Sequence, residues 1–107
     1  MANKQRENMS LLFFIKKTKL LKNGEAPICL RITVNRQTAE IRIKRSVLIE
    51  KWNQAKGCAN GKDRQTKELN SYLDTVRYKM FQIHRELELD LQVPVTTTAI
   101  LDRYYLS

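Results

Sequence analysis

The chain has 107 residues, a formal net charge of +9 and a hydrophobic content of 42%. This length holds one modest domain and excludes most self-sufficient catalytic folds, while the apolar content is high enough to exclude wholesale disorder. No apolar run approaches the ~18 residues that cross a bilayer, and the run at residues 11–15 is too short for a signal peptide, so we expect a cytoplasmic protein with no membrane partner.

Three segments in the first half of the chain have the pattern of β-strands. The first runs from Leu11 to Lys19 and ends at an Asn-Gly turn in residues 22–25. The second, residues 28–34, alternates strictly between apolar and polar side chains, and so does the third, residues 38–44. Residues 35–37 between them are short enough for a tight hairpin. We therefore predict an antiparallel meander with one apolar face and one polar, basic face.

A helical period replaces the strand period from about Arg64 to Leu91. Apolar residues recur there at intervals of three and four and form one stripe on a helix of ~40 Å. Asp63 or Thr66 is the expected N-cap. Because this helix is longer than a three-stranded sheet is wide, its C-terminal half should project or carry a neighbouring domain. The stripe consists of Leu69, Leu73, Val76, Met80, Ile83 and Leu87.

Pro94 ends the helical pattern, and residues 96–106 have the pattern of an N-cap and the first turns of another helix. The predicted fold class is therefore α+β. It contains a three-stranded antiparallel β-sheet packed on one long C-terminal α-helix (β-β-β-α), with the start of a further helix.

The sequence offers no constellation of residues for catalysis or metal binding. Cys29, Cys58 and His84 provide at most three nitrogen or sulfur ligands, whereas a tetrahedral zinc site needs four. The glycines fit no phosphate-binding loop, and no serine lies in a nucleophile elbow. We expect no catalytic residue, no metal, no cofactor and no small-molecule substrate.

All of the excess positive charge lies in the part of the chain that contains the strands. Residues 1–65 carry 15 Lys and Arg against five acids, a net charge of +10, whereas residues 66–107 carry five against six, a net charge of −1. This asymmetry predicts a surface that faces a polyanion and is supported by a neutral scaffold. A basic surface that serves only solubility is the alternative.

The strand alternation places the basic residues on the polar face of the predicted sheet. Arg31, Arg42 and Lys44 lie on this face, and Thr33, Asn35, Arg36 and Glu40 lie beside them. Either Lys16 or Lys17 should join them, because the preceding apolar run does not determine the phase of the first strand. A small sheet of this kind can enter the ~12 Å major groove of duplex DNA. Arg can then bind guanine with two hydrogen bonds, while Lys and Thr mostly bind phosphates.

The chain resembles the N-terminal arm-type DNA-binding domain of tyrosine recombinases, the phage-type integrases of bacterial conjugative transposons and related mobile elements. The resemblance rests on residues 12–17, 22–35, 39–41, 52–53 and 70–74, together with Val47. It implies an arm-type domain at residues 10–92, which follows an N-terminus at residues 1–9 that we expect to be disordered because residues 1–8 are polar. A linker and the first turns of a truncated core-binding helical domain follow at residues 93–107.

The resemblance also implies a site, a partner and a location. The sheet would enter the major groove of arm-type sites, and the candidate DNA-binding residues are Lys16, Lys17, Arg31, Thr33, Asn35, Arg36, Glu40, Arg42 and Lys44. The partner would be double-stranded DNA of the bacterial nucleoid, with protomer–protomer contacts in a recombination complex. The family's catalytic Arg, His-x-x-Arg box and Tyr belong to a later domain, and here His84 is followed by Leu87 where the box has Arg.

Two alternatives and one departure from the family pattern remain open. A basic domain built from a sheet and a helix could instead bind double-stranded RNA, or the long helix could dock a neighbouring protomer. The third strand of the family often ends in a turn that contains a small residue or glycine. Here Lys44-Arg45-Ser46 has no glycine, which leaves the exit of this strand undetermined.

Overall fold

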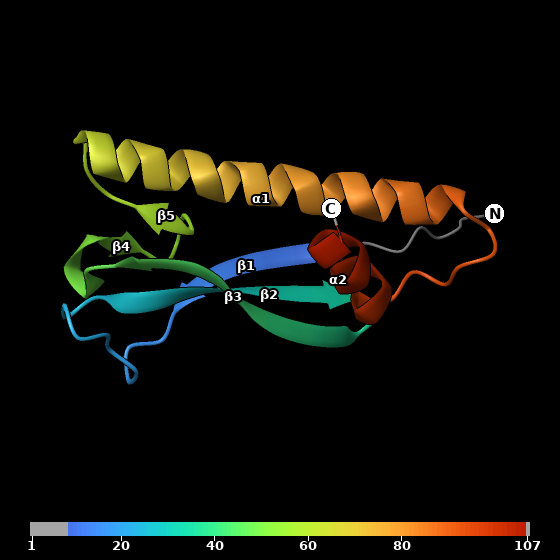
Figure 1. The fold of residues 1–107 in the computed structure, drawn as a ribbon, viewed down its shortest axis with the longest axis horizontal. Helices are drawn as coiled ribbons and strands as arrows, with labels where there is room; N and C mark the ends of the chain where they lie inside the picture. The colour runs from blue at the N-terminus through green and yellow to red at the C-terminus, as the bar shows by residue number, and fades with distance from the viewer. Residues whose placement is uncertain (1–8, 107) are drawn as a thin grey trace.

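The computed structural model describes residues 9–106, and it consists of a three-stranded antiparallel sheet with a long helix on one face (Figure 1). The predicted α+β class is confirmed. Residues 1–8 of the expected disordered N-terminus lie outside the described residues, and Met9 begins the first strand. The elements are β1 (Met9–Ile15), β2 (Ala26–Val34), β3 (Gln37–Val47), the 3₁₀ turn η1 (Ile49–Lys51), β4 (Trp52–Asn53), β5 (Cys58–Ala59), α1 (Arg64–Leu89) and α2 (Thr97–Leu106).

The sheet has the strand order β1-β2-β3, so β2 is its central strand. The side chains of β2 that face α1 are fully buried, and the apolar residues of β1 and β3 that share this face complete the core. In β1, Phe13 and Ile15 are the buried residues, which places Leu12 and Phe14 on the opposite face. The buried residues of the sheet face are Met9, Phe13, Ile15, Ala26, Ile28, Leu30, Ile32, Val34, Ile43 and Val47.

The first strand is shorter at its C-terminal end than the sequence predicts. Its last backbone hydrogen bond to β2 joins the amide of Lys16 to the carbonyl of Pro27. Beyond it the chain forms a loop that is closed by the amide of Leu21 and the carbonyl of Glu25, 2.8 Å apart. Gly24 has a φ of 83° in this loop, a conformation that glycine adopts without strain. The predicted Asn-Gly turn is therefore confirmed, but Lys17 to Lys19 belong to the loop.

Helix α1 buries the predicted stripe against the sheet. Leu73, Val76, Met80, Ile83 and Leu87 are all buried, and Leu69 packs partly buried against the same core. The expected projection of this helix rests on a comparison of its length with the width of the sheet. In Figure 1, however, α1 runs along the strands, so its length has to be compared with the length of the strands.

Asp63 is the N-cap of α1. Its carboxylate accepts hydrogen bonds from the Thr66 amide at 3.2 Å and from the Thr66 hydroxyl at 2.7 Å. These bonds hold the pKa of Asp63 below its ordinary value, and the bond from the Thr66 hydroxyl has the larger effect. The carboxylate thus satisfies one of the amides that the first helical turn leaves without a partner.

We expect Asp63→Ala to lower the melting temperature at neutral pH, because the Thr66 amide loses its acceptor. A lowered folded-state pKa means that this stabilisation is present above the unfolded-state pKa and is lost as the pH falls through the folded-state pKa. Thermal unfolding of both proteins from about pH 7 to about pH 2 should show the difference in Tm shrinking in acid. Asp63→Asn keeps a capping oxygen without a proton to titrate, and is the control. An equal Tm difference between wild type and Asp63→Ala at both ends of the range would contradict this role.

The β4–β5 hairpin is tied to α1 by one side chain. Asn70 accepts a hydrogen bond from the amide of Ala59 and donates one to its carbonyl, both at 2.9 Å. Gln54, in the turn of this hairpin, donates to the carbonyl of Phe13 at 3.0 Å and so covers part of the free edge of β1. The irregular segment between the sheet and α1 is therefore held by side-chain bonds to both.

Helix α2 packs against the same core as the sheet. Ile100 is fully buried within one cluster together with Leu87, and Arg103 of α2 forms an ion pair with Glu86 of α1 at 3.7 Å. Figure 1 shows α2 at the hairpin end of the sheet, below the C-terminal half of α1, whose last turns extend further. The C-terminal half of α1 thus contacts α2, while the expectation that it carries a neighbouring domain, and the assignment of α2 to that domain, stay proposals.

Candidate nucleic-acid interface

The sheet has a polar face that points away from α1, which we call the outer face. The strand register places its residues in cross-strand pairs, with Leu12 opposite Arg31, Phe14 opposite Cys29, Arg31 opposite Glu40 and Cys29 opposite Arg42. Lys16 joins this face at the end of β1, through its ion pair with Glu40. The outer face consists of Ser10, Leu12, Phe14, Lys16, Cys29, Arg31, Thr33, Thr38, Glu40 and Arg42.

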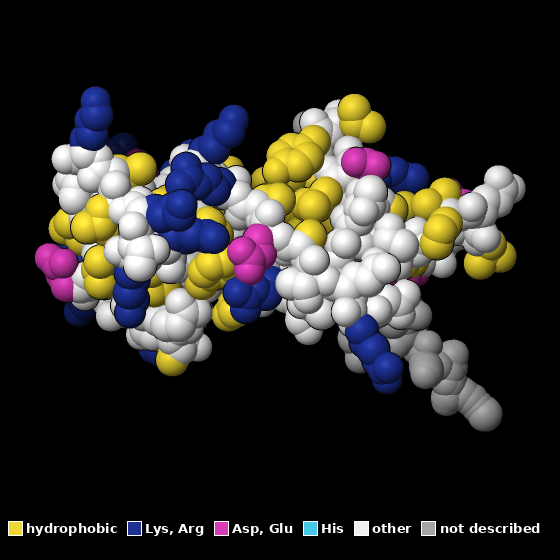
Figure 2. All heavy atoms as spheres, turned by 90° about the horizontal axis from the view of Figure 1, so that it is seen from below, with side chains coloured by type: hydrophobic (Ala, Val, Ile, Leu, Met, Phe, Trp, Pro, Cys, Tyr) yellow, Lys and Arg dark blue, Asp and Glu magenta, His cyan; other side chains and the backbone are white. Residues whose placement is uncertain are grey.

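Figure 2 shows this side of the molecule. Lys and Arg side chains gather over one half of it, with an acidic side chain at their margin. The β1–β2 loop, which carries Lys17 and Lys19, descends below the sheet on this side in Figure 1. Both lysines are exposed. The loop thus extends the basic surface beyond the end of β1, and Lys19 is a basic residue that the sequence did not single out.

Three charged side chains at the centre of the outer face are joined to one another. Arg31 Nε and Nη2 both donate to Glu40 Oε2, at 2.9 and 2.8 Å, and Lys16 Nζ lies 3.7 Å from Glu40 Oε1. The guanidinium of Arg31 also lies over the ring of Phe14, 4.9 Å from its centroid, and Lys16 Nζ is 5.9 Å from it. Arg31 is therefore positioned both by a carboxylate and by an aromatic ring.

Next to this cluster lie an uncharged thiol and an exposed arginine. Cys29 is buried, and burial raises the pKa of its thiol above the ordinary value against the opposing effect of Lys16 and Arg42. Arg42 is exposed, and within residues 9–106 it forms no ion pair. Its full charge is therefore available to a partner of the outer face.

The β2–β3 hairpin carries two further candidates at its tip. Asn35 and Arg36 have φ values of 55° and 66°, which is the geometry of a two-residue type I′ turn. This turn confirms the tight hairpin that the sequence predicts. Thr33 is placed at the base of the turn, where its hydroxyl lies 3.4 Å from that of Thr38. Asn35 and Arg36 are exposed beyond the end of the outer face.

Lys44 lies at an irregularity of β3 rather than on the regular ladder. The register between β2 and β3 shifts beside Pro27 and Cys29, and Lys44 has a φ of 61°. A bulge of this kind leaves residues unpaired and redirects the side chains that follow. The alternation that places Lys44 beside Arg42 therefore ends before Lys44, although Lys44 is exposed. The segment at residues 44–46 is therefore not the exit of β3, because the strand passes through this bulge and continues to Val47.

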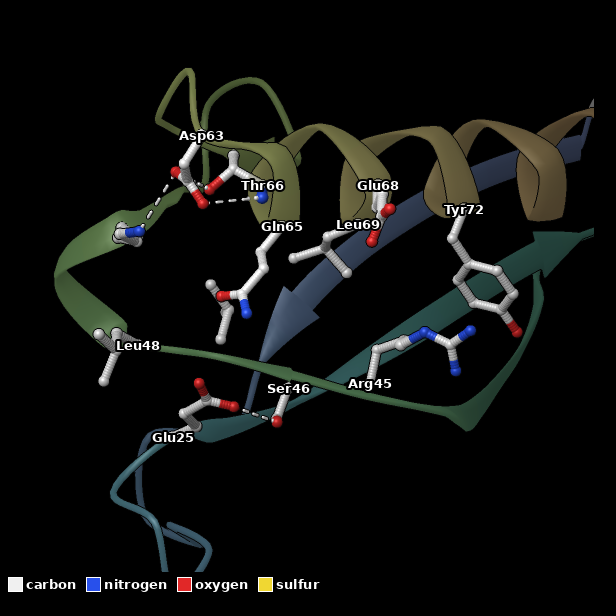
Figure 3. A pocket seen from close by; sticks show the side chains of 12 residues that line it. Glu25, Arg45, Ser46, Leu48, Asp63, Gln65, Thr66, Glu68, Leu69 and Tyr72 are labelled. Carbon is white, nitrogen blue, oxygen red and sulfur yellow. Dashed lines mark hydrogen bonds and ion pairs between the residues drawn. The ribbon is translucent and has the colours of Figure 1, made fainter.

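The bulge turns Arg45 toward α1. Its guanidinium lies over the ring of Tyr72, 3.9 Å from the centroid, in the hollow between β3 and α1 (Figure 3). The acids around this hollow already have partners, since Asp63 lies 3.5 Å from Lys51, Glu68 lies 3.2 Å from Arg64, and Glu25 accepts a hydrogen bond from the Ser46 hydroxyl. Arg45 therefore supports the fold on the helix side, and is distinct from the basic residues of the outer face.

The structure brings Lys16, Arg31, Thr33, Glu40 and Arg42 together on one face. The loop and hairpin place Lys17, Asn35 and Arg36 at its two ends, and Lys44 follows the bulge. Sequence reasoning missed Leu12 and Phe14, because all residues from 11 to 15 are apolar and show no alternation. In the described residues no group of three or more His, Cys, Asp or Glu is arranged to hold a metal ion. None of the helices in this part of the chain is long and apolar enough to cross a membrane.

A three-stranded sheet with a basic outer face, supported by a long helix, defines a small nucleic-acid-binding module of the β-sheet class. A family model described as "Arm DNA-binding domain" matches residues 13–100. The chain therefore belongs to the arm DNA-binding domain family, which confirms the resemblance. DNA is the partner that this family implies, and the domain type is non-catalytic. Neither the comparison with curated proteins nor the comparison with solved structures gives a match.

Proposed function

We propose that the outer face of the sheet enters the major groove of double-stranded DNA and reads its sequence. Three strands spaced ~4.8 Å apart span about 10 Å between their outer backbones, which fits a groove ~12 Å wide. The observation that carries the proposal is the outer face itself, where Lys16, Arg31 and Arg42 lie together. Arg31 and Arg42 would approach base edges, and Lys16 would approach phosphates.

The biological role proposed here follows from the family. In this role the domain positions an integrase, a site-specific tyrosine recombinase, on arm-type sites of a bacterial mobile element during DNA integration and excision. The candidate contacts at the two ends of the face, Lys17 in the loop and Asn35 and Arg36 in the hairpin, would bind the flanking phosphates. Thr33 would do the same within the groove, and Lys44 would follow the backbone at the end of β3.

Salt dependence of binding tests whether the partner is a nucleic acid. If ~4–6 phosphates are contacted, the logarithm of the association constant should fall with the logarithm of salt concentration with a slope of about −4 to −5. The measurement is a fluorescence-anisotropy titration of a labelled duplex at several salt concentrations. A flat response would remove every nucleic-acid function.

Competition between duplex types separates DNA from RNA. The A-form major groove of RNA is deep and narrow and does not admit side chains from a sheet, so duplex RNA should compete poorly with duplex DNA. Equal competition by an RNA duplex of the same sequence would favour the alternative, a double-stranded RNA-binding module.

The long helix supports a separate proposal for protomer contacts. The stripe on α1 is already used by the core, so it does not offer a docking face. Tyr78, Phe81 and Leu89 of α1 are exposed and would form the contact between neighbouring protomers in a recombination complex. Their support is this exposure, and the same titrations on DNA with two adjacent sites would reveal the contact as cooperative binding.

A further inference from the structure

Among the described residues of the outer face, Glu40 is the one with an acidic side chain. Its negative charge opposes the attraction between this face and DNA. A carboxylate in the middle of a surface that binds phosphates is unfavourable for affinity, because it repels the backbone. Its side chain is 36% exposed, so it would stand directly before a bound duplex. A residue that costs affinity at the centre of an interface calls for another role in recognition.

The contacts of Glu40 determine which part of Arg31 is left for a partner. Glu40 Oε2 accepts from Nε and Nη2 of Arg31, along one edge of the guanidinium. Glu40 does not use the two N–H groups of Nη1 or the second N–H group of Nη2. One N–H group from each of these nitrogens points along the adjacent edge of the guanidinium. Phe14 lies against the guanidinium face. The free edge is therefore a fixed two-donor fork, which matches the O6 and N7 acceptors of guanine.

The same contacts change the charge that Arg31 presents. An Arg–carboxylate pair is nearly neutral at a distance, so it attracts a phosphate much less than a lone arginine does. Guanine, in contrast, is recognised by the geometry of two hydrogen bonds as well as by charge. Lys16, at 3.7 Å from the other oxygen of Glu40, has its charge reduced in the same way. Glu40 thus weakens contacts with any backbone while keeping the contact with one base.

We propose that Glu40 is a specificity-determining residue, which holds Arg31 as a reader of guanine and suppresses its use as a phosphate anchor. The proposal rests on the proposed function, since it assumes that the outer face binds duplex DNA. Without Glu40 the side chain of Arg31 would be free to turn to the nearest phosphate. Sequence discrimination would then fall while general affinity for DNA rises.

The test compares two substitutions in the full chain that remove the same charge. Glu40→Gln removes the carboxylate that pairs with Arg31. The control, Glu68→Gln, removes the carboxylate that pairs with Arg64 on α1, where the N···O distance is 3.2 Å. Wild type is first used to select a preferred duplex from a random pool. Affinities for that duplex and for a scrambled duplex of equal composition are then measured at several salt concentrations.

For Glu40→Gln we expect tighter binding to the scrambled duplex, with a salt slope steeper by about 0.9 because one more phosphate is contacted. The ratio of the two affinities should fall by about tenfold, within the ~1–3 kcal/mol that a bidentate base contact contributes to discrimination. Glu68→Gln should leave the ratio and both slopes near the wild-type values. In an Arg31→Ala background, Glu40→Gln should no longer change the ratio.

Each other outcome identifies which idea has failed. If wild type prefers its selected duplex but Glu40→Gln keeps the same ratio and slopes, this role of Glu40 is wrong and the proposed function stands. Equal weakening on both duplexes would also overturn it, because Glu40 would then only support the fold. If wild type selects no sequence, sequence-specific binding fails, and the role of Glu40 fails with it.

Discussion

Arg31→Ala is expected to weaken binding to the preferred duplex by ~1–3 kcal/mol, which corresponds to about a fivefold to 150-fold rise in Kd. The substitution removes the fork that faces guanine and the contact with Phe14. It also leaves Glu40 facing the DNA without its closest counter-charge. The fold should stay intact, because Arg31 points away from the core on the outer face. Anisotropy titrations measure the effect, and thermal unfolding checks the fold.

Substitutions of two further arginines, one on the outer face and one away from it, show whether the effect is specific to the outer face. Arg64→Ala is the control, because Arg64 also forms an ion pair with a glutamate, Glu68, but on the exposed side of α1. This substitution should leave the affinity for DNA nearly unchanged. Arg42→Ala should also cost ~1–3 kcal/mol, because an unpaired arginine on the outer face contributes its full charge or a base contact. Wild-type affinity in both the Arg31 and the Arg42 variants would remove the outer face from the proposed function.

Ile100→Ala is expected to destabilise the protein by ~2–5 kcal/mol, the range for truncating a buried aliphatic side chain to alanine. Ile100 is fully buried and lies in the same core cluster as the sheet and α1. A loss of this size is a large fraction of the ~5–15 kcal/mol that stabilises an ordinary domain. Urea unfolding followed by circular dichroism measures it.

The control for this prediction lies at the end of the same helix. Leu106 is 86% exposed, so Leu106→Ala should change stability by less than ~0.5 kcal/mol. If Ile100→Ala cost as little as Leu106→Ala, α2 would be an appendage of the arm domain. The measurement thus also tests whether the structural unit ends near residue 92 or includes α2.

The elements with a clear period could be predicted from the sequence. Strict alternation in residues 28–34 determined which face each side chain of β2 occupies, and the intervals of three and four in α1 identified its buried stripe. Local chemistry also predicted the hairpin at residues 35–37 and limited the N-cap to Asp63 or Thr66, of which the structure has Asp63. The placement of Arg31, Thr33, Glu40 and Arg42 on one face of the sheet could be predicted in the same way, because they lie on strands that alternate.

The remaining features of the site depend on contacts between elements. The phase of β1 cannot be read from five consecutive apolar residues, and pairing with β2 decided that Phe14 and Lys16 lie on the outer face. The ion pair between Arg31 and Glu40 joins residues nine positions apart, and it exists because the β2–β3 register places them opposite each other. The bulge that turns Arg45 toward Tyr72 likewise depends on the register shift.

The sequence by itself therefore determined the fold class, the long helix, the segregation of +10 of charge into residues 1–65 and the family resemblance. These depend on periodicity, turn chemistry and composition, which are local properties of the chain. Only the tertiary structure decided the phase of β1, the end of the regular ladder before Lys44, the packing of α2 and the central position of Glu40 between two cations. The physical reason is that each of these is selected by packing and pairing between distant segments, which the local pattern leaves free.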